Sequence, residues 1–265
     1  MSTPHVTAPS YVEGHGLLAD RVVVVTAAAG AGIGAAVARR VLEEGAKAVV
    51  LGDVHERRLA ESEEALATEL GRDRVTSRLC DVTVESQVHG LLDAADQFGG
   101  CDVLINNAGL GGTASITEMT DEEWSRVLDI TLTGTMRCIR AAGRRWTESG
   151  TAGVIVNNAS VVGWRAQEGQ AHYAAAKAGV MALTRCAAMD LAPQGIRVNA
   201  VSPSLAMHPF LEKVTSAELL EELKGREAFG RAAEPWEVAN VMVFLASPYS
   251  SYLTGEVVSV SSQHA

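Results

Sequence analysis

The chain of 265 residues has little of what marks several classes of protein. Its four cysteines, Cys80, Cys101, Cys138 and Cys186, are far apart and form no CxxC pair, which favours free thiols in a reducing cytoplasm and no metal site. Basic residues number 22 against 32 acidic ones, and the formal charge of −10 argues against a nucleic-acid surface. No apolar run approaches the length that spans a bilayer, and we recognise no signal peptide. The sequence therefore predicts a cytoplasmic protein that binds neither nucleic acid nor membrane, although a local basic pocket could still hold an anionic ligand.

Internal repeats, low-complexity tracts and dividing linkers are also lacking. We expect a single domain over 16–265, because the apolar share of 47% is ample for a buried core. Residues 1–15 mix Ser, Thr, Pro and Gly without periodicity, so they are predicted to form a flexible N-terminal arm.

What the chain does have is a regular alternation of apolar runs and helical patterns. The runs are too apolar for strands with one face in water, which indicates a parallel sheet covered on both sides. The prediction is an α/β fold, a single Rossmann-type doubly wound domain with a parallel seven-stranded sheet and helices on both faces. The expected strands are 21–26, 48–51, 76–79, 103–105, 154–157, 197–201 and 257–260. The expected helices are 32–44, 56–70, 85–98, 121–142, 172–191 and 235–245.

One segment, 204–230, breaks this rhythm. It is a long insertion between a strand and a helix, with a short helical pattern of its own at 217–223. Insertions of this length in compact domains are often binding lids, so we predict a substrate lid here. An inert surface loop is the alternative.

A glycine-rich turn follows the first strand. Gly30, Gly32 and Gly34 lie between a valine run and a helix, where backbone N–H groups can approach a pyrophosphate and the helix dipole favours its charge. Asp53 ends the next strand, where it can accept hydrogen bonds from both hydroxyls of an adenosine ribose. We therefore predict a dinucleotide site. A tight turn without a ligand is the alternative.

Asp53 also bears on which dinucleotide binds. Its carboxylate would repel a 2′-phosphate, so NAD(H) is favoured over NADP(H). Arg57 and Arg58 lie nearby and oppose this preference, although helix periodicity points at least one of them to solvent. NADP(H) therefore stays open.

Three side chains predict a reacting centre. Ser160 follows a strand at the edge where such sheets open to ligands, and Tyr173 and Lys177 share one face of a helix. Interconverting an alcohol and a ketone needs a proton donor or acceptor at the oxygen, which Ser160 can hold beside the phenol. Lowering a tyrosine pKa of about 10 to neutrality takes roughly 4 kcal/mol, the scale of a lysine ammonium at about 4 Å in a partly shielded site. A positive nicotinamide would add to it, whereas a tyrosine that merely packs over a lysine stem is the alternative.

Together these motifs resemble the short-chain dehydrogenase/reductase family, from about residue 17 to 260. Other matching sequences are Asp81-Val82, Asn106-Asn107-Ala108-Gly109, residues 199–203 and Tyr252-Leu253-Thr254-Gly255. The resemblance implies an NAD(P)-dependent oxidoreductase in which Lys177 binds the nicotinamide ribose and tunes Tyr173. It also implies a homotetramer or dimer built on the helices 121–142 and 172–191. The expected cofactor-binding residues are Ala28, Gly32, Ile33, Gly34, Asp53, Asp81, Val82, Asn107, Ala108, Gly109, Tyr173, Lys177 and Pro203.

The chain departs from the family pattern in several places. The usual Thr-Gly opening of the turn is Ala27-Ala28, which could widen the turn. Thr131 stands where a helix Asn commonly completes a proton-relay tetrad, and its shorter side chain must place any water differently. The other departures are Ser204 after Pro203, His208 in place of a Thr that often contacts the carboxamide, and Ser261-Ser262 in place of a final Gly-Gly. Since Ser160, Tyr173 and Lys177 are intact, we expect an active enzyme.

Local sequences at 27–30, 157–160, 163–167, 202–204 and 259–261 resemble a narrower group, the bacterial sterol-catabolism reductases that act on a cyclic acyl-CoA. Such a substrate needs an apolar pocket with a cationic rim. The candidate pocket residues are Leu110, Val162, Trp164, Leu205, Met207 and Phe210, and the candidate rim residues are Arg165, Lys213, Lys224 and Arg226. Trp164, Arg165 and His208 are the predicted substrate contacts, with core packing or solvated surface roles as alternatives. His172 is expected on the helix surface.

Two other functions stay open. A 3-oxoacyl-CoA or acyl-carrier-protein reductase, of the acetoacetyl-CoA type, would share every motif but prefer NADPH, which Asp53 opposes. A catalytically silent dinucleotide-binding regulator is supported only by Thr131 and the altered turn.

Overall fold

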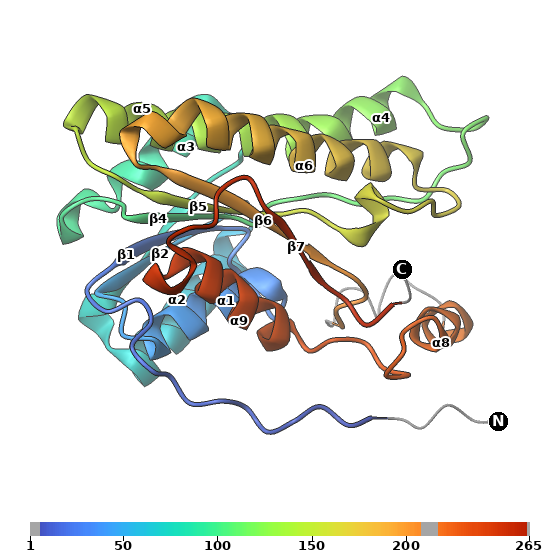
Figure 1. Ribbon diagram of the computed structural model, residues 1–265, viewed down its shortest axis with the longest axis horizontal. Helices are drawn as coiled ribbons and strands as arrows, with labels where there is room; N and C mark the ends of the chain where they lie inside the picture. The colour runs from blue at the N-terminus through green and yellow to red at the C-terminus, as the bar shows by residue number, and fades with distance from the viewer. Residues whose placement is uncertain (1–5, 208–216, 264–265) are drawn as a thin grey trace.

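The computed structural model describes residues 6–207 and 217–263, and Figure 1 shows a sheet between two layers of helices. Seven parallel strands lie in the order β3-β2-β1-β4-β5-β6-β7. The strands are β1 (Val22–Thr26), β2 (Ala48–Asp53), β3 (Val75–Leu79), β4 (Val103–Asn106), β5 (Val154–Asn158), β6 (Arg197–Pro203) and β7 (Val257–Val260). The helices are α1 (Ile33–Glu43), α2 (Glu56–Leu70), α3 (Glu85–Asp93), α4 (Asp121–Leu128), α5 (Gly134–Ser149), α6 (Ala171–Leu191), α8 (Ala217–Gly225) and α9 (Pro235–Ala246). The predicted doubly wound α/β fold is confirmed.

The central strands are apolar because helices cover both of their faces. Every residue of β1 and β2 is buried, and Val23 pairs with Val49 of β2 on one side and Val103 of β4 on the other. Helices α1, α2 and α9 cover one face, and α3, α5 and α6 cover the other (Figure 1). Since all strands are parallel, their carboxyl ends meet at one edge of the sheet, where the loops after β1, β4, β5 and β6 gather.

One predicted helix is divided. The pattern at 121–142 predicts a single helix, whereas the structure has α4, a π-helical turn over Asp129–Thr133, and α5, which continues to Ser149. A π-helical turn inserts an extra residue into the repeat and often occurs at functional sites. Thr131 lies in this turn and is fully buried.

The N-terminal segment lies against α1 and α9. The Tyr11 ring packs edge to face on Trp236, with 5.4 Å between ring centroids. Arg40 and Glu44 form a buried ion pair of 2.6 Å, and Arg40 also donates to the carbonyl of Glu13 at 3.3 Å. Side-chain and backbone contacts therefore hold the described part of the segment that the sequence predicts as a flexible arm.

Candidate active site

Ser160, Tyr173 and Lys177 meet at the carboxyl edge of the sheet. Ser160 follows β5 and begins a short 3-10 turn (Val161–Gly163), where its Oγ accepts a hydrogen bond from Val162 N at 3.3 Å. Tyr173 and Lys177 lie one turn apart near the start of α6, and the Lys177 Nζ is 5.6 Å from the centre of the Tyr173 ring. The predicted grouping of these three side chains therefore exists in the fold.

Burial dominates the electrostatics of this group. It raises the pKa of Tyr173, and a hydrogen bond with Ser160 acts in the opposite direction. It also lowers the pKa of Lys177 to about 8. With the protein's own groups alone, the Tyr173 phenol is therefore harder to deprotonate than free tyrosine. The sequence predicts that Lys177 lowers this pKa, and the direction found here is the opposite.

Asn158 connects Lys177 to the predicted cofactor cleft, and sequence reasoning assigned it no role. Its backbone carbonyl accepts a hydrogen bond from Lys177 Nζ at 2.5 Å, and its side-chain Nδ2 donates to Asn107 Oδ1 at 2.9 Å. A polar side chain at the end of an otherwise apolar strand was a signal for the contact with Asn107, whereas nothing in the sequence marks the backbone contact with Lys177.

Thr131 holds a loop rather than offering a free hydroxyl. Its Oγ1 accepts a hydrogen bond from Leu110 N at 2.9 Å and donates to Leu110 O at 3.2 Å. The loop passes between Thr131 and Lys177, since a Cβ placed on Gly109 would lie 3.4 Å from Lys177 Nζ and 3.7 Å from Thr131 Oγ1. A hydroxyl has one proton, so Thr131 has none left to pass to a water.

The glycine turn is fastened to the neighbouring strands. Ala28 N donates to Gly52 O at 3.0 Å, and the Thr26 hydroxyl accepts from Asn107 N at 2.9 Å and from Ala108 N at 3.0 Å. Gly34 leaves no room for a side chain, because a Cβ there would lie 2.1 Å from Ala27 O. The turn is therefore held in one shape by β2 and β4.

The glycine turn borders open space at the start of α1. A Cβ placed on Gly30 or Gly32 would meet nothing within 4 Å, so these backbones border open space at the start of α1. Asp53 is buried, and its carboxylate accepts hydrogen bonds from Ala29 N at 3.1 Å and His55 N at 2.9 Å. These residues fit the group that the motif predicts.

The two arginines near Asp53 behave differently. Arg57 is exposed and pairs with Glu61 at 2.9 Å. Arg58 opposes the rise that burial causes in the pKa of Asp53, and with Arg39 it lines a hollow of about 350 Å³ beside Gly30. Arg58 therefore lies on the predicted cofactor side, whereas Arg57 does not line this hollow.

The other predicted cofactor residues lie at or just after the ends of neighbouring strands, or at the start of α1. Asp81 accepts from Thr83 N at 2.9 Å and Oγ1 at 2.7 Å, and Val82 packs so closely on Gly134 that a Cβ there would lie 2.6 Å from it. Ile33 is the first residue of α1, and Pro203 is the buried last residue of β6.

The predicted substrate residues are placed less uniformly. Trp164 is half exposed, and the Arg165 guanidinium donates to Gln263 Oε1. Lys224 and Arg226, predicted as rim cations, pair instead with Glu221 at 2.8 Å and Glu222 at 2.6 Å. Leu110, Val162, Leu205 and Met207 are partly buried at this edge. His208, Phe210 and Lys213 lie outside the described residues.

The prediction that His172 lies on the helix surface is wrong. Only 2% of it is exposed, and a Cβ placed on Gly112 would lie 2.9 Å from its Nε2. The loop after β4 covers it, which the local sequence of α6 does not reveal.

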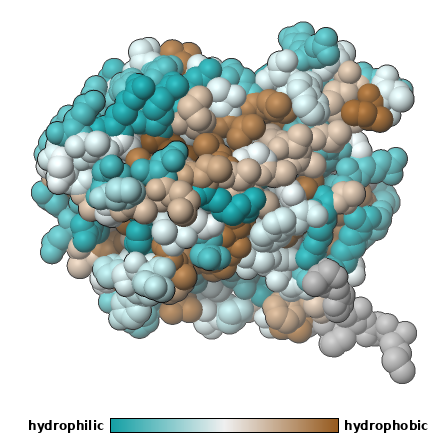
Figure 2. Space-filling model, turned by 45° about the horizontal axis from the view of Figure 1, so that its top comes forward, coloured by the Kyte–Doolittle hydropathy of each residue, from teal (hydrophilic) through white to brown (hydrophobic). Residues whose placement is uncertain are grey.

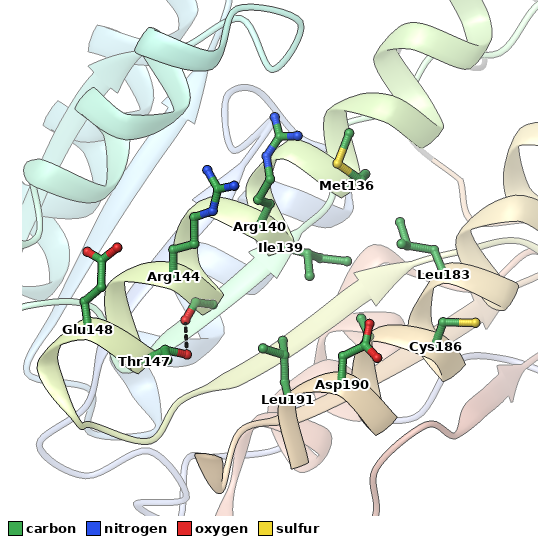
Figure 3. Close-up of a pocket in the computed structure, with 12 residues that line it drawn as sticks. Met136, Ile139, Arg140, Arg144, Thr147, Glu148, Leu183, Cys186, Asp190 and Leu191 are labelled. Carbon is green, nitrogen blue, oxygen red and sulfur yellow. Dashed lines mark hydrogen bonds between the residues drawn. The ribbon is translucent and has the colours of Figure 1, made fainter. Parts of the chain in front are cut away.

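A separate apolar groove of about 390 Å³ lies between α5 and α6, away from Ser160. Ile139 of α5 and Leu183 and Leu191 of α6 face it, with Arg144 and Glu148 at its border (Figure 3). Hydrophobic side chains form a band across this side of the molecule (Figure 2).

The chain is similar to several known proteins over most of its length. A family model described as enoyl-(acyl carrier protein) reductase matches residues 27–262. A (5R,7aS)-5-hydroxy-7a-methyl-1-oxo-2,3,5,6,7,7a-hexahydro-1H-indene-carboxyl-CoA reductase of Mycobacterium tuberculosis is 61% identical over 258 residues, covering 97% of this chain and 98% of that protein. A cis-4-hydroxycyclohexanecarboxylate dehydrogenase of Sinomonas cyclohexanicum is 43% identical, covering 91% of this chain and 95% of that protein.

A solved structure supports the same relation. A short chain dehydrogenase from Mycobacterium smegmatis has a TM-score of 0.86 and 56% identity, covering 98% of this chain and 99% of that chain. The predicted resemblance to cyclic acyl-CoA reductases is therefore confirmed. A search of residues 6–207 and 217–263 finds no helix with the length and hydrophobicity of a membrane span. The chain belongs to the short-chain dehydrogenase/reductase family and is an NAD(P)-dependent oxidoreductase.

Proposed function

We propose that the protein interconverts a secondary alcohol and a ketone on a bulky cyclic acyl-CoA, such as a fragment of a sterol ring system. The observation that carries the reaction is the meeting of Ser160, Tyr173 and Lys177 beside the glycine turn. The substrate class is supported by the name of the relative that is 61% identical over 97% of the chain.

In this proposal Tyr173 is the general acid and base. Ser160 holds the substrate oxygen next to the phenol, and Tyr173 gives that oxygen a proton in reduction or takes one in oxidation. When bound, the dinucleotide supplies or accepts a hydride at the substrate carbon, and its oxidised ring brings a positive charge. That charge, together with the Lys177 ammonium, opposes the burial that raises the pKa of Tyr173.

Lys177 and Asn158 position this centre. The Asn158 carbonyl holds the Lys177 ammonium at 2.5 Å, which directs it toward the cleft where a nicotinamide ribose would lie. Thr131 supports the loop that borders the same ammonium and is not assigned a proton relay.

NAD(H) is the proposed cofactor. Asp53 lies at the end of β2, where it would bond the ribose hydroxyls and repel a 2′-phosphate. Arg58 lines the same region, so NADP(H) is the second candidate.

Arg165 is the proposed rim cation for the CoA part of the substrate. It lies five residues after Ser160, and no carboxylate in residues 6–207 and 217–263 pairs with it. Trp164, half exposed beside it, is a proposed contact for the ring system.

We also propose that two copies associate through the groove between α5 and α6, as a step toward a homotetramer. The groove combines apolar side chains with charges of both signs, so a second copy could cover it by two-fold symmetry. Leu183→Arg should lower the mass measured by sedimentation.

We place the reaction in the cytoplasm, since Cys80, Cys101 and Cys138 are buried free thiols.

The deciding experiment is a substrate screen with NADH and NADPH. Polycyclic ketones are offered as CoA thioesters and as CoA-free ketones, and oxidation of the reduced cofactor is followed. We expect the cyclic thioesters with NADH to give the highest kcat/KM. Faster turnover of short linear 3-oxoacyl thioesters with NADPH would favour the 3-oxoacyl reductase instead.

A variant tests the rim directly. Arg165→Ala should raise KM for a cyclic CoA thioester by about tenfold, the loss of one charge-assisted hydrogen bond, and leave the CoA-free ketone nearly unchanged. An equal effect on both substrates would remove Arg165 from the CoA site.

A further inference from the structure

A chain of polar contacts links the C-terminal segment to the loop after Ser160. The Gln263 side chain lies between two partners that are far apart in the sequence. Its Oε1 accepts a hydrogen bond from Arg165 Nη1, and its Nε2 donates to Glu227 Oε1 at 2.9 Å. The three residues come from the loops after β5 and α8 and from the segment after β7, which meet at the carboxyl edge of the sheet.

Glu227 determines which way the Gln263 amide faces. It is only 3% exposed, and its other oxygen accepts a hydrogen bond from Ser262 Oγ at 2.8 Å. The backbones of Glu227 and Gln263 are also paired in an antiparallel bridge. Both Glu227 oxygens accept hydrogen bonds and a guanidinium can only donate, so the Gln263 amide turns its NH₂ group to Glu227 and its oxygen to Arg165.

This arrangement orients Arg165 without neutralising it. A guanidinium has five N–H donors, and among the described residues the one acceptor found for its side chain is the neutral Gln263 oxygen. A carboxylate in that place would pair with the charge, whereas an amide holds the side chain and leaves the charge for a ligand. Fixing the rotamer in advance also reduces the entropy lost when an anion binds.

We propose that Gln263 is a positioning residue that sets substrate specificity. Held by Glu227, it aims the Arg165 guanidinium at the anionic part of a CoA thioester. The inference rests on the proposed function, from which it takes the substrate class. The C-terminal segment thus acts on recognition of the thioester and not on proton transfer at Tyr173.

The test is Gln263→Leu, which keeps the approximate shape and removes both hydrogen bonds. We expect KM for a cyclic ketone CoA thioester to rise about tenfold, while kcat and the kinetics of the CoA-free ketone change less than about twofold. Gln194→Leu, at an exposed glutamine far from this edge, is the matched control and should change neither. Thermal unfolding and NADH binding verify that each variant is folded.

A double variant separates this inference from the proposed function. In an Arg165→Ala background, Gln263→Leu should have no further effect, because it acts through Arg165. If Arg165→Ala weakens thioester binding selectively but Gln263→Leu does not, the inference is overturned and the proposed function stands. If no CoA thioester is turned over, both fall. Should Gln263→Leu not fold, Gln263→Asn, whose shorter amide cannot reach both partners, must show the same selective rise in KM.

Discussion

The proposed cofactor side and the proposed substrate side of the candidate active site are held together in different ways. On the cofactor side, contacts join residues at the ends of neighbouring strands, such as Thr26 of β1 with Asn107 after β4 and Ala29 after β1 with Asp53 of β2. On the substrate side, Arg165, Gln263 and Glu227 join loops that lie beyond the strand ends. The register of the sheet determines the contacts on the cofactor side. The contacts on the substrate side depend instead on how three loops fold over the edge of the sheet.

The largest effect is expected where the two sides meet. Tyr173→Phe should lower kcat about a thousandfold, because it removes the proton donor without changing the shape of the site. NADH affinity, measured by fluorescence titration, should change little if strand ends fix the cofactor side. Tyr249→Phe, on a side chain that is 77% exposed, is the control. Retention of full activity by Tyr173→Phe would end the proposed mechanism.

The next effect concerns the buried ammonium of Lys177. Burial lowers the pKa of Lys177 from 10.5 to about 8, so between these pH values the unfolded chain binds more protons than the folded one. The stability of the wild type relative to Lys177→Met should therefore rise with pH across this window, by up to about 3 kcal/mol. Urea unfolding at pH 7 and pH 10 measures the difference. Equal changes in both proteins would contradict the burial of a charged Lys177.

A smaller effect is expected at Asp53. Asp53→Ser should raise KM for NADH about tenfold and lower KM for NADPH, because the ribose loses its acceptor and a 2′-phosphate no longer meets a carboxylate. The KM for the CoA thioester should stay as it is, since the change lies on the cofactor side. Asp73→Ser, at an exposed position, is the control. A loss of affinity for both dinucleotides would show that Arg58 does not offset the missing acceptor.

The smallest effect is expected in the turn itself. Ala27 has a φ of 50°, in the left-handed region that glycine adopts more easily. Ala27→Gly should therefore stabilise the protein by roughly 0.5–1 kcal/mol, measured by thermal unfolding, with unchanged NADH affinity. Ala29→Gly, in the same turn at an ordinary φ, should have the opposite sign. If both variants destabilise the protein, Ala27 is not strained.

The sequence predicted which residues would gather on the proposed cofactor side, because its signals there are local. The valine run of β1, the glycines of the turn and Asp53 at the end of β2 each lie where a strand begins or ends, and parallel pairing brings these ends together. Ser160, Tyr173 and Lys177 were found for the same reason, since one ends a strand and two share a helix face. Asn158 was missed because its contact with Lys177 uses the backbone carbonyl, which every residue has.

By itself the sequence determined the alternation of strands and helices, and hence the edge of the sheet at which Ser160, Tyr173 and Lys177 gather. The tertiary structure alone decided that His172 is buried and that the Thr131 hydroxyl is used in hydrogen bonds with the Leu110 backbone. It also brought Gln263 to Arg165 across 98 residues. Periodicity encodes which face of an element is apolar, but contacts between loops depend on how each loop packs against the others, and no short-range pattern records that.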